Sequence, residues 1–170
     1  MPLLILTLCC YSDTSATANA CTLFYLAKHP HIMRKLQRQL DAAMPDGPRS
    51  WSYDKVTTVT YLDDVIKESM RLKPPVITGG YRVTPAEGLQ VDEVWIPGDV
   101  NVFVPFQVLH TDERYFAKPL DFVPERWDER KEEMGTDESL LIPFSAGKSC
   151  SKCSTIAPLA AAPFRHGSRF

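Results

Sequence analysis

The chain has 170 residues, enough for one domain with a sizeable core, and its formal net charge of −2 argues against a nucleic-acid partner. Its five cysteines are an odd number without the spacing of a disulfide framework, which favours a reducing compartment. Ten of the 14 prolines lie from Pro74 onward, so we expect a helical first half and a loop-rich second half.

The first predicted element is a helix over residues 3–28. Apolar residues continue past residue 20 without a break, as in a single helix. The alternative is a secretory signal peptide, because Ala18 and Ala20 fit the small-residue rule of a cleavage site. We favour the helix, since no Lys or Arg precedes the apolar run and the run is too short to span a bilayer.

An acid and a hydroxyl, Asp13 and Thr14, stand side by side in the middle of this predicted helix. Both side chains compete for backbone hydrogen bonds, so they are poor choices for a helix interior. One interpretation is an exposed polar patch. The other is a proton relay, in which the acid passes protons through the alcohol and bound water.

Two further helices are predicted over residues 30–44 and 59–72. Apolar residues recur at helical spacing in both, and basic residues of the first form either a solvated face or a docking face for a redox partner. In the second helix, Glu68 and Arg71 are three residues apart and share a face. On a generic helix such a pair is exposed and contributes about 0.3–0.5 kcal/mol.

Short β-strands and loops are expected over residues 79–127. Segments 81–84, 89–91, 94–96 and 100–105 carry β-branched or alternating residues, which predicts a small antiparallel sheet appended to a helical body. The fold class is therefore mainly α with a small antiparallel β-sheet (α+β). A short helix should cover residues 107–110, and His110 is a poor metal-ligand candidate because no second ligand lies at a suitable spacing.

A packed loop over residues 122–127 and a solvated segment over 128–139 precede a cysteine-bearing loop at 141–153. In that loop, Gly147 would allow positive φ or a close approach of the backbone to a flat ligand. Lys148 lies near Cys150 and could hold a thiolate charge. The alternative is a surface loop with an idle cysteine.

These segments, in this order, resemble the C-terminal half of the cytochrome P-450 (heme-thiolate monooxygenase) family. Residues 13–15 are similar to the family's oxygen-activating helix, and Glu68 and Arg71 to its Glu-x-x-Arg signature. Residues 124–127 are similar to its Pro-Glu-Arg-Phe segment, with Trp127 for Phe. Phe144 and Gly147 match the first half of its heme loop, Phe-x-x-Gly-x-Arg-x-Cys-x-Gly.

The resemblance implies a role for each matching residue. Asp13 and Thr14 would deliver protons, and Arg82 would bind a heme propionate through bidentate hydrogen bonds. Cys150 would ligate the iron, where a thiolate favours O–O cleavage. The remaining implied residues are the heme-loop residues Phe144 and Gly147 and a buried structural trio of Glu68, Arg71 and Arg126.

It also implies heme as the cofactor, an electron-donating reductase as a partner and a small apolar organic substrate. Family members are often anchored to the endoplasmic-reticulum membrane and face the cytosol. We expect this chain to lack the anchor, and so to be cytosolic if expressed as given.

The chain departs from the family pattern at three places. Counting from Gly147, the iron ligand should be Ser151, so Cys150 comes one residue early, and Ser149 takes the place of the expected arginine. The tail over residues 154–170 contains two prolines where the family continues as a helix. In the first helix, Tyr11 stands where the family has a small residue that leaves space for dioxygen.

Two functional classes follow for what we expect to be an incomplete domain. The first is a heme-dependent monooxygenase, and the alternative is a non-catalytic truncated family member unable to hold heme. A weaker third possibility is a zinc or redox site formed by Cys150, Cys153 and His166, although a single Cys-x-x-Cys pair is a poor signal.

Overall fold

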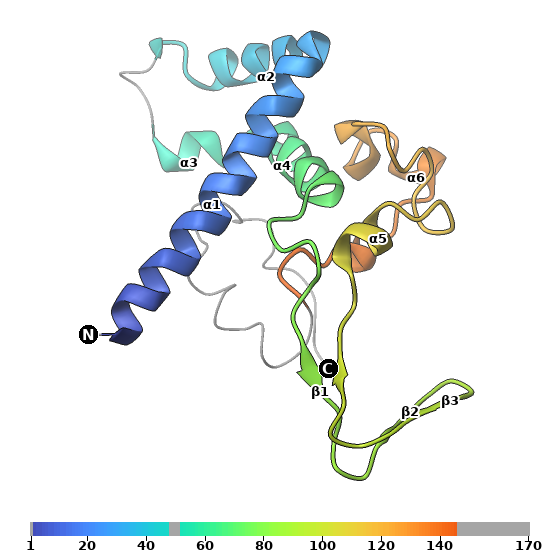
Figure 1. Ribbon diagram of the computed structural model, residues 1–170. Coiled ribbons are helices and arrows are strands. Elements are labelled where there is room, and N and C mark those ends of the chain that lie inside the picture. The colour runs from blue at the N-terminus through green and yellow to red at the C-terminus, as the bar shows by residue number, and fades with distance from the viewer. Residues whose placement is uncertain (1, 48–51, 146–170) are drawn as a thin grey trace.

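The computed structural model describes residues 2–47 and 52–145, with side chains from Asp13 onward. Long helices form the first half, and short helices, strands and loops form the second (Figure 1). This α+β architecture confirms the predicted fold class. The helices are α1 (Pro2–Lys28), α2 (Pro30–Ala43), α3 (Tyr53–Val56), α4 (Thr60–Leu72), α5 (Phe106–His110) and α6 (Lys131–Met134). The 3-10 helices are η2 (Pro124–Trp127) and η3 (Glu138–Leu140).

The boundary between α1 and α2 follows from local chemistry at His29 and Pro30. A residue before proline is disfavoured in the α region, and His29 has φ −122° and ψ 76°. Pro30 then occupies the first turn of α2, where its missing N–H costs nothing. On α2 the buried side chains are Ile32 and Leu36, one helical turn apart, so this helix packs through one apolar stripe.

Helix α4 is the centre of the described structure. It packs against α1, α2, α5 and η2, and most of its second half is buried. The main apolar core joins it to α2 and to the segment before η2, and its buried members are Ile32, Leu36, Val59, Tyr61, Val65, Leu72 and Phe122. Because α4 is covered on several sides, its charged residues in the second half must find partners inside the protein.

The strands form two separate two-stranded antiparallel ladders, so the expectation of one small sheet was wrong in this detail. Strand β1 (Arg82–Val83) pairs with β4 (Asn101–Val102), and β2 (Leu89–Val91) pairs with β3 (Val94–Ile96). In Figure 1 the β2–β3 hairpin extends away from the helices.

The two ladders separate at a pair of prolines, Pro85 and Pro97. Neither has an N–H to donate, so the ladder cannot continue through them. The hydroxyl of Thr84 bridges the gap, donating to the Pro97 carbonyl at 2.7 Å and accepting from the Val100 N–H at 3.1 Å. Thr84 is accordingly buried, with 4% of its surface exposed.

The segment at 128–139 is not simply the solvated excursion that its charge predicts. It forms α6 and η3, and the side chains of Met134 and Thr136 are buried. Gly135 ends α6 with φ 57°, the left-handed conformation that glycine adopts without strain. Among the described helices, none is both long and apolar enough to cross a membrane.

Candidate functional site

The Glu68 carboxylate is the centre of a buried charge cluster between α4 and η2. Its Oε1 accepts from Arg71 Nη2 at 2.9 Å, from Arg126 Nε at 3.0 Å and from the backbone N–H of Val123 at 2.9 Å. Its Oε2 accepts from Arg71 Nε at 3.0 Å and from Trp127 Nε1 at 3.1 Å. The three charged side chains have no exposed surface. The structure therefore brings together the three residues of the expected trio.

The guanidinium of Arg71 is fully hydrogen-bonded. Besides its two bonds to Glu68, Nη1 donates to the carbonyls of His110 and Pro119, each at 2.7 Å. Its Nη2 also donates to the carbonyl of Asp121 at 3.1 Å. These bonds use all five N–H donors of an arginine, so burial leaves no donor of Arg71 unsatisfied.

Arg126 is held in the same way from η2. It donates to the carbonyls of Ala117 at 2.8 Å and Lys118 at 3.1 Å, in addition to Glu68. Burial lowers the pKa of Arg126, but an arginine keeps its charge in proteins. One carboxylate faces two guanidiniums, so the cluster carries a net charge of about +1, and the surrounding carbonyl dipoles stabilise that excess.

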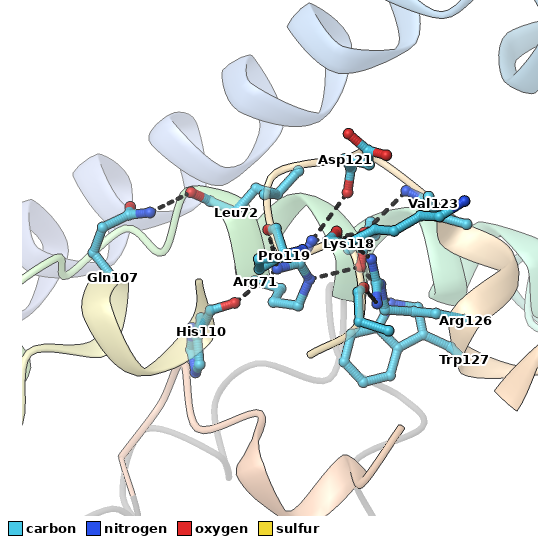
Figure 2. Close-up of polar contacts among 12 residues, drawn as sticks. Arg71, Leu72, Gln107, His110, Lys118, Pro119, Asp121, Val123, Arg126 and Trp127 are labelled. Carbon is cyan, nitrogen blue, oxygen red and sulfur yellow. Dashed lines mark hydrogen bonds and ion pairs between the residues drawn. The ribbon is translucent and has the colours of Figure 1, made fainter. Parts of the chain in front are cut away.

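Figure 2 shows how the cluster ties distant segments together. Arg71 comes from α4, Arg126 and Trp127 from η2, and the carbonyls of Lys118 and Pro119 from the loop between α5 and η2. Sequence reasoning missed the Trp127 hydrogen bond. The signal was present, because an indole N–H replaces a phenyl edge beside the charged residues.

A second ionic network fixes η2 to α2 and to the start of α4. Glu125 Oε1 accepts from Tyr61 Oη at 2.7 Å and from Lys35 Nζ at 3.0 Å. Lys35 also bonds Glu129 and lies 4.2 Å from the centre of the Tyr61 ring. Lys35, on the basic face of α2, therefore has a structural role, whereas Arg34 and Arg38 are exposed.

Arg82 lies on β1, beside the start of the cysteine-bearing loop. Its exposed guanidinium donates from Nη1 to the Tyr81 carbonyl at 2.9 Å and from Nη2 to the Ser145 hydroxyl at 3.2 Å. No carboxylate of the described residues forms an ion pair with Arg82. Ser145 has φ 67°, an uncommon conformation for a residue other than glycine. A guanidinium with only neutral described partners at this place fits a carboxylate-bearing group held beside the loop.

The other residues expected at the loop are only partly described. Phe144 is half-buried, whereas Gly147 and Cys150 lie outside the described residues, as do Cys153 and His166. Among the described side chains, no group of three or more His, Cys, Asp or Glu residues could hold a metal ion.

Asp13 and Thr14 lie on α1, and neither belongs to the buried charge cluster. Asp13 is exposed and Thr14 is half-buried. The helix passes through this pair without interruption, so the polar residues do not break it. The side chain of Tyr11 lies outside the described side chains.

Comparison with known proteins defines the class to which this fold and cluster belong. The family model of cytochrome P-450 matches residues 11–150, which include α1 from residue 11 onward, the Glu68 cluster and the loop as far as Cys150. The chain belongs to the cytochrome P-450 family. Heme is the cofactor that membership implies, and the guanidinium of Arg82 is the described feature that fits it.

Individual relatives come from fungi and animals. The chain is 46% identical over 136 residues to the cytochrome P-450 monooxygenase eupD of Phoma sp, covering 80% of this chain and 46% of that protein. It is 41% identical over 139 residues to the monooxygenase FCK2 of Fusarium pseudograminearum, covering 81% of this chain and 24% of the relative. It is 33% identical over 135 residues to cytochrome P-450 3A5 of Homo sapiens, covering 79% and 26%. The chain thus spans less than half the length of these relatives.

Proposed function

We propose that this chain is part of a heme-dependent monooxygenase, which inserts one oxygen atom of O2 into a small apolar organic substrate with electrons from a reductase. The observation that carries the proposal is the Arg82–Ser145 contact. It puts a guanidinium that has no ion-pair partner among the described residues at the entrance of the loop that contains Cys150. The names of the relatives, which include monooxygenases, support the same chemistry.

Each residue then has a role that its environment permits. Arg82 would exchange its neutral partners for a heme propionate, which is a stronger acceptor for a guanidinium. Phe144 and Gly147 would shape the loop around the heme, and Cys150 would supply the iron ligand. When bound, heme would supply oxygen activation. Asp13 and Thr14 would hold and pass protons on the α1 side.

The buried cluster would act through structure alone. Glu68, Arg71 and Arg126 have no exposed surface, so they cannot touch a substrate. Their hydrogen bonds fix η2 and the preceding loop on α4. The cluster would thereby hold the chain that follows η2 in the position required for the cysteine-bearing loop.

The second candidate is a non-catalytic family member that cannot hold heme. The observation that favours it is the early position of Cys150 with Ser149 in place of arginine. The two candidates differ in whether Cys150 can reach the iron once the rest of the domain is supplied.

The test is a fusion of this chain to the N-terminal half of a relative, with one residue inserted between Lys148 and Ser149. After addition of hemin, we expect a thiolate-type spectrum that Cys150→Ser abolishes and Cys153→Ser leaves unchanged. Addition of a reductase and an electron donor should then give oxygen-dependent turnover of an apolar substrate. Absence of the thiolate spectrum even from the fusion with the insertion would contradict the heme-thiolate proposal for this loop. A spectrum that appears only with the insertion would support the heme-thiolate origin of the loop and assign the unmodified chain to the non-catalytic candidate.

A further inference from the structure

His110, a poor candidate for a metal ligand, is one of the most buried polar residues of the described structure. It is the last residue of α5, and none of its surface is exposed. The rings of Phe106 and Phe116 lie beside it, with centroids 6.1 Å and 6.4 Å away. An imidazole is costly to bury among aromatic rings unless its polar atoms are used.

The backbone and the ring of His110 make hydrogen bonds to different parts of the protein. Its backbone carbonyl accepts from Arg71 Nη1 at 2.7 Å, which joins it to the buried charge cluster. Its ring Nε2 accepts from the backbone N–H of Ile142 at 3.1 Å, which joins it to the segment that leads to Cys150. In Figure 2 the carbonyl points to Arg71 and the ring points away from it.

The hydrogen bond from the Ile142 N–H determines which nitrogen of the His110 ring carries the proton. A nitrogen that accepts from an N–H cannot itself carry a proton, so the proton of the neutral ring is on Nδ1, which has no hydrogen-bond partner among the described residues. Burial, and then the charge of Arg71, lower the pKa of His110 to about 4, in agreement with a neutral ring. A protonated ring would turn a donor toward the Ile142 N–H and break this link.

The segment around Ile142 has further described contacts on both sides of its link to His110. It follows η3, and Leu141 packs against Phe116 and Trp127. A turn follows Ile142, in which the N–H of Ser145 donates to the Ile142 carbonyl at 2.9 Å. Ile142 therefore uses its carbonyl for the turn into the cysteine-bearing loop and its N–H for His110.

We propose that His110 is a positioning residue, which fixes the start of the cysteine-bearing loop to the buried charge cluster through its neutral Nδ1–H tautomer. The link runs from Glu68 through Arg71 to the His110 backbone, and from the His110 ring to Ile142. The functional role of this hydrogen-bonded link rests on the proposed heme function. The hydrogen bonds themselves form without heme, so the link can be measured in the heme-free chain.

The test is hydrogen exchange of the Ile142 amide in the full chain, with no hemin present. His110→Phe keeps an aromatic ring but removes the acceptor, and we expect Ile142 to exchange about tenfold faster or more, because a partly buried donor loses its partner. His110→Gln places an amide oxygen near the position of Nε2 and should restore most of the protection. Tyr61→Phe is the control, since it removes a buried hydrogen bond to Glu125 and not to this segment.

A second measurement does not depend on any variant folding. Nitrogen NMR of the unmodified chain near neutral pH should show His110 with the proton on Nδ1 and none on Nε2. A proton on Nε2 would overturn the proposal, as would equal Ile142 exchange in His110→Phe and Tyr61→Phe. Failure of hemin binding in the fusion would refute the proposed function and leave these two results unaffected, so the two failures can be told apart.

Discussion

Removing the charge of Glu68 should destabilise the protein far more than removing the charge of an ordinary surface pair. Glu68→Gln keeps the shape of the side chain but leaves Arg71 and Arg126 buried without a carboxylate. Of the five donors that the carboxylate accepts, those facing the new amide N–H2 group lose their acceptor. Breaking a buried ion pair by removing one partner costs about 3–5 kcal/mol.

That loss is a large part of the stability of a single domain, which is about 5–15 kcal/mol. We therefore expect Glu68→Gln to lower the midpoint of thermal unfolding by about 10 °C or more. Urea unfolding followed by far-ultraviolet circular dichroism would give the change in free energy directly.

The chain supplies a matched control in Glu133. It pairs with Arg130 at the same three-residue spacing at 2.6 Å, but the pair is exposed to solvent. Glu133→Gln should leave the unfolding midpoint close to that of the unmodified chain. Equal shifts for Glu68→Gln and Glu133→Gln would refute the inference that burial makes the cluster important.

Three further substitutions test separate features by the same unfolding measurements. Trp127→Phe should cost about 2 kcal/mol, because it removes a hydrogen bond to a charged group, whereas Trp95→Phe on the exposed hairpin should have little effect. Gly79→Ala should destabilise more than Gly47→Ala. Both glycines have positive φ, which costs alanine about 1 kcal/mol or more, but only at Gly79 would the new methyl group collide with the Val104 carbonyl. Burial raises the pKa of Asp64 to about 7, so the folded chain holds a proton there that the unfolded chain releases above about pH 4. Stability should fall as pH rises through this window, and Asp64→Asn should stabilise the chain at pH 8 by about 2–4 kcal/mol and hardly at pH 4.

Each of these predictions has an outcome that would contradict it. Equal effects of the two tryptophan substitutions would mean that the indole N–H is not essential to the cluster. Equal effects of the two glycine substitutions would mean that the β4–α5 connection yields to a methyl group. A constant effect of Asp64→Asn at pH 4 and pH 8 would show that this carboxyl titrates as an exposed one does.

The helices of the first half were predictable from sequence because their determinants are local. Apolar spacing and Pro30 are sufficient to place α1 and α2. Burial of Glu68 was not predictable from spacing, since Arg130 and Glu133 have the same spacing on the surface. It follows from the packing of η2 on α4, which only the family resemblance indicated.

The hydrogen-bond acceptors around the two arginines of the cluster could not be predicted from the sequence either. Every residue has a backbone carbonyl, so the residue types do not indicate that those of Pro119 and Lys118 accept these bonds. The link from His110 to Ile142 joins residues 32 positions apart through one backbone N–H, which any residue except proline supplies. Separation of the strands into two ladders could have been inferred from Pro85 and Pro97, whose missing N–H groups interrupt the pairing.

The position of Cys150 relative to Gly147 is the most direct test of the central claim, that this chain carries a heme-thiolate loop with a displaced ligand. An extended residue spans about 3.3–3.6 Å, and a metal–sulfur bond cannot stretch by that amount. The measurement is the thiolate-type spectrum with hemin of the fusion to a relative's N-terminal half, with and without one residue inserted between Lys148 and Ser149. We predict a weak or absent thiolate spectrum for the unmodified loop and a full one after the insertion. A full thiolate spectrum from the unmodified loop would contradict the displaced-ligand claim and favour the enzyme proposal for the unmodified chain.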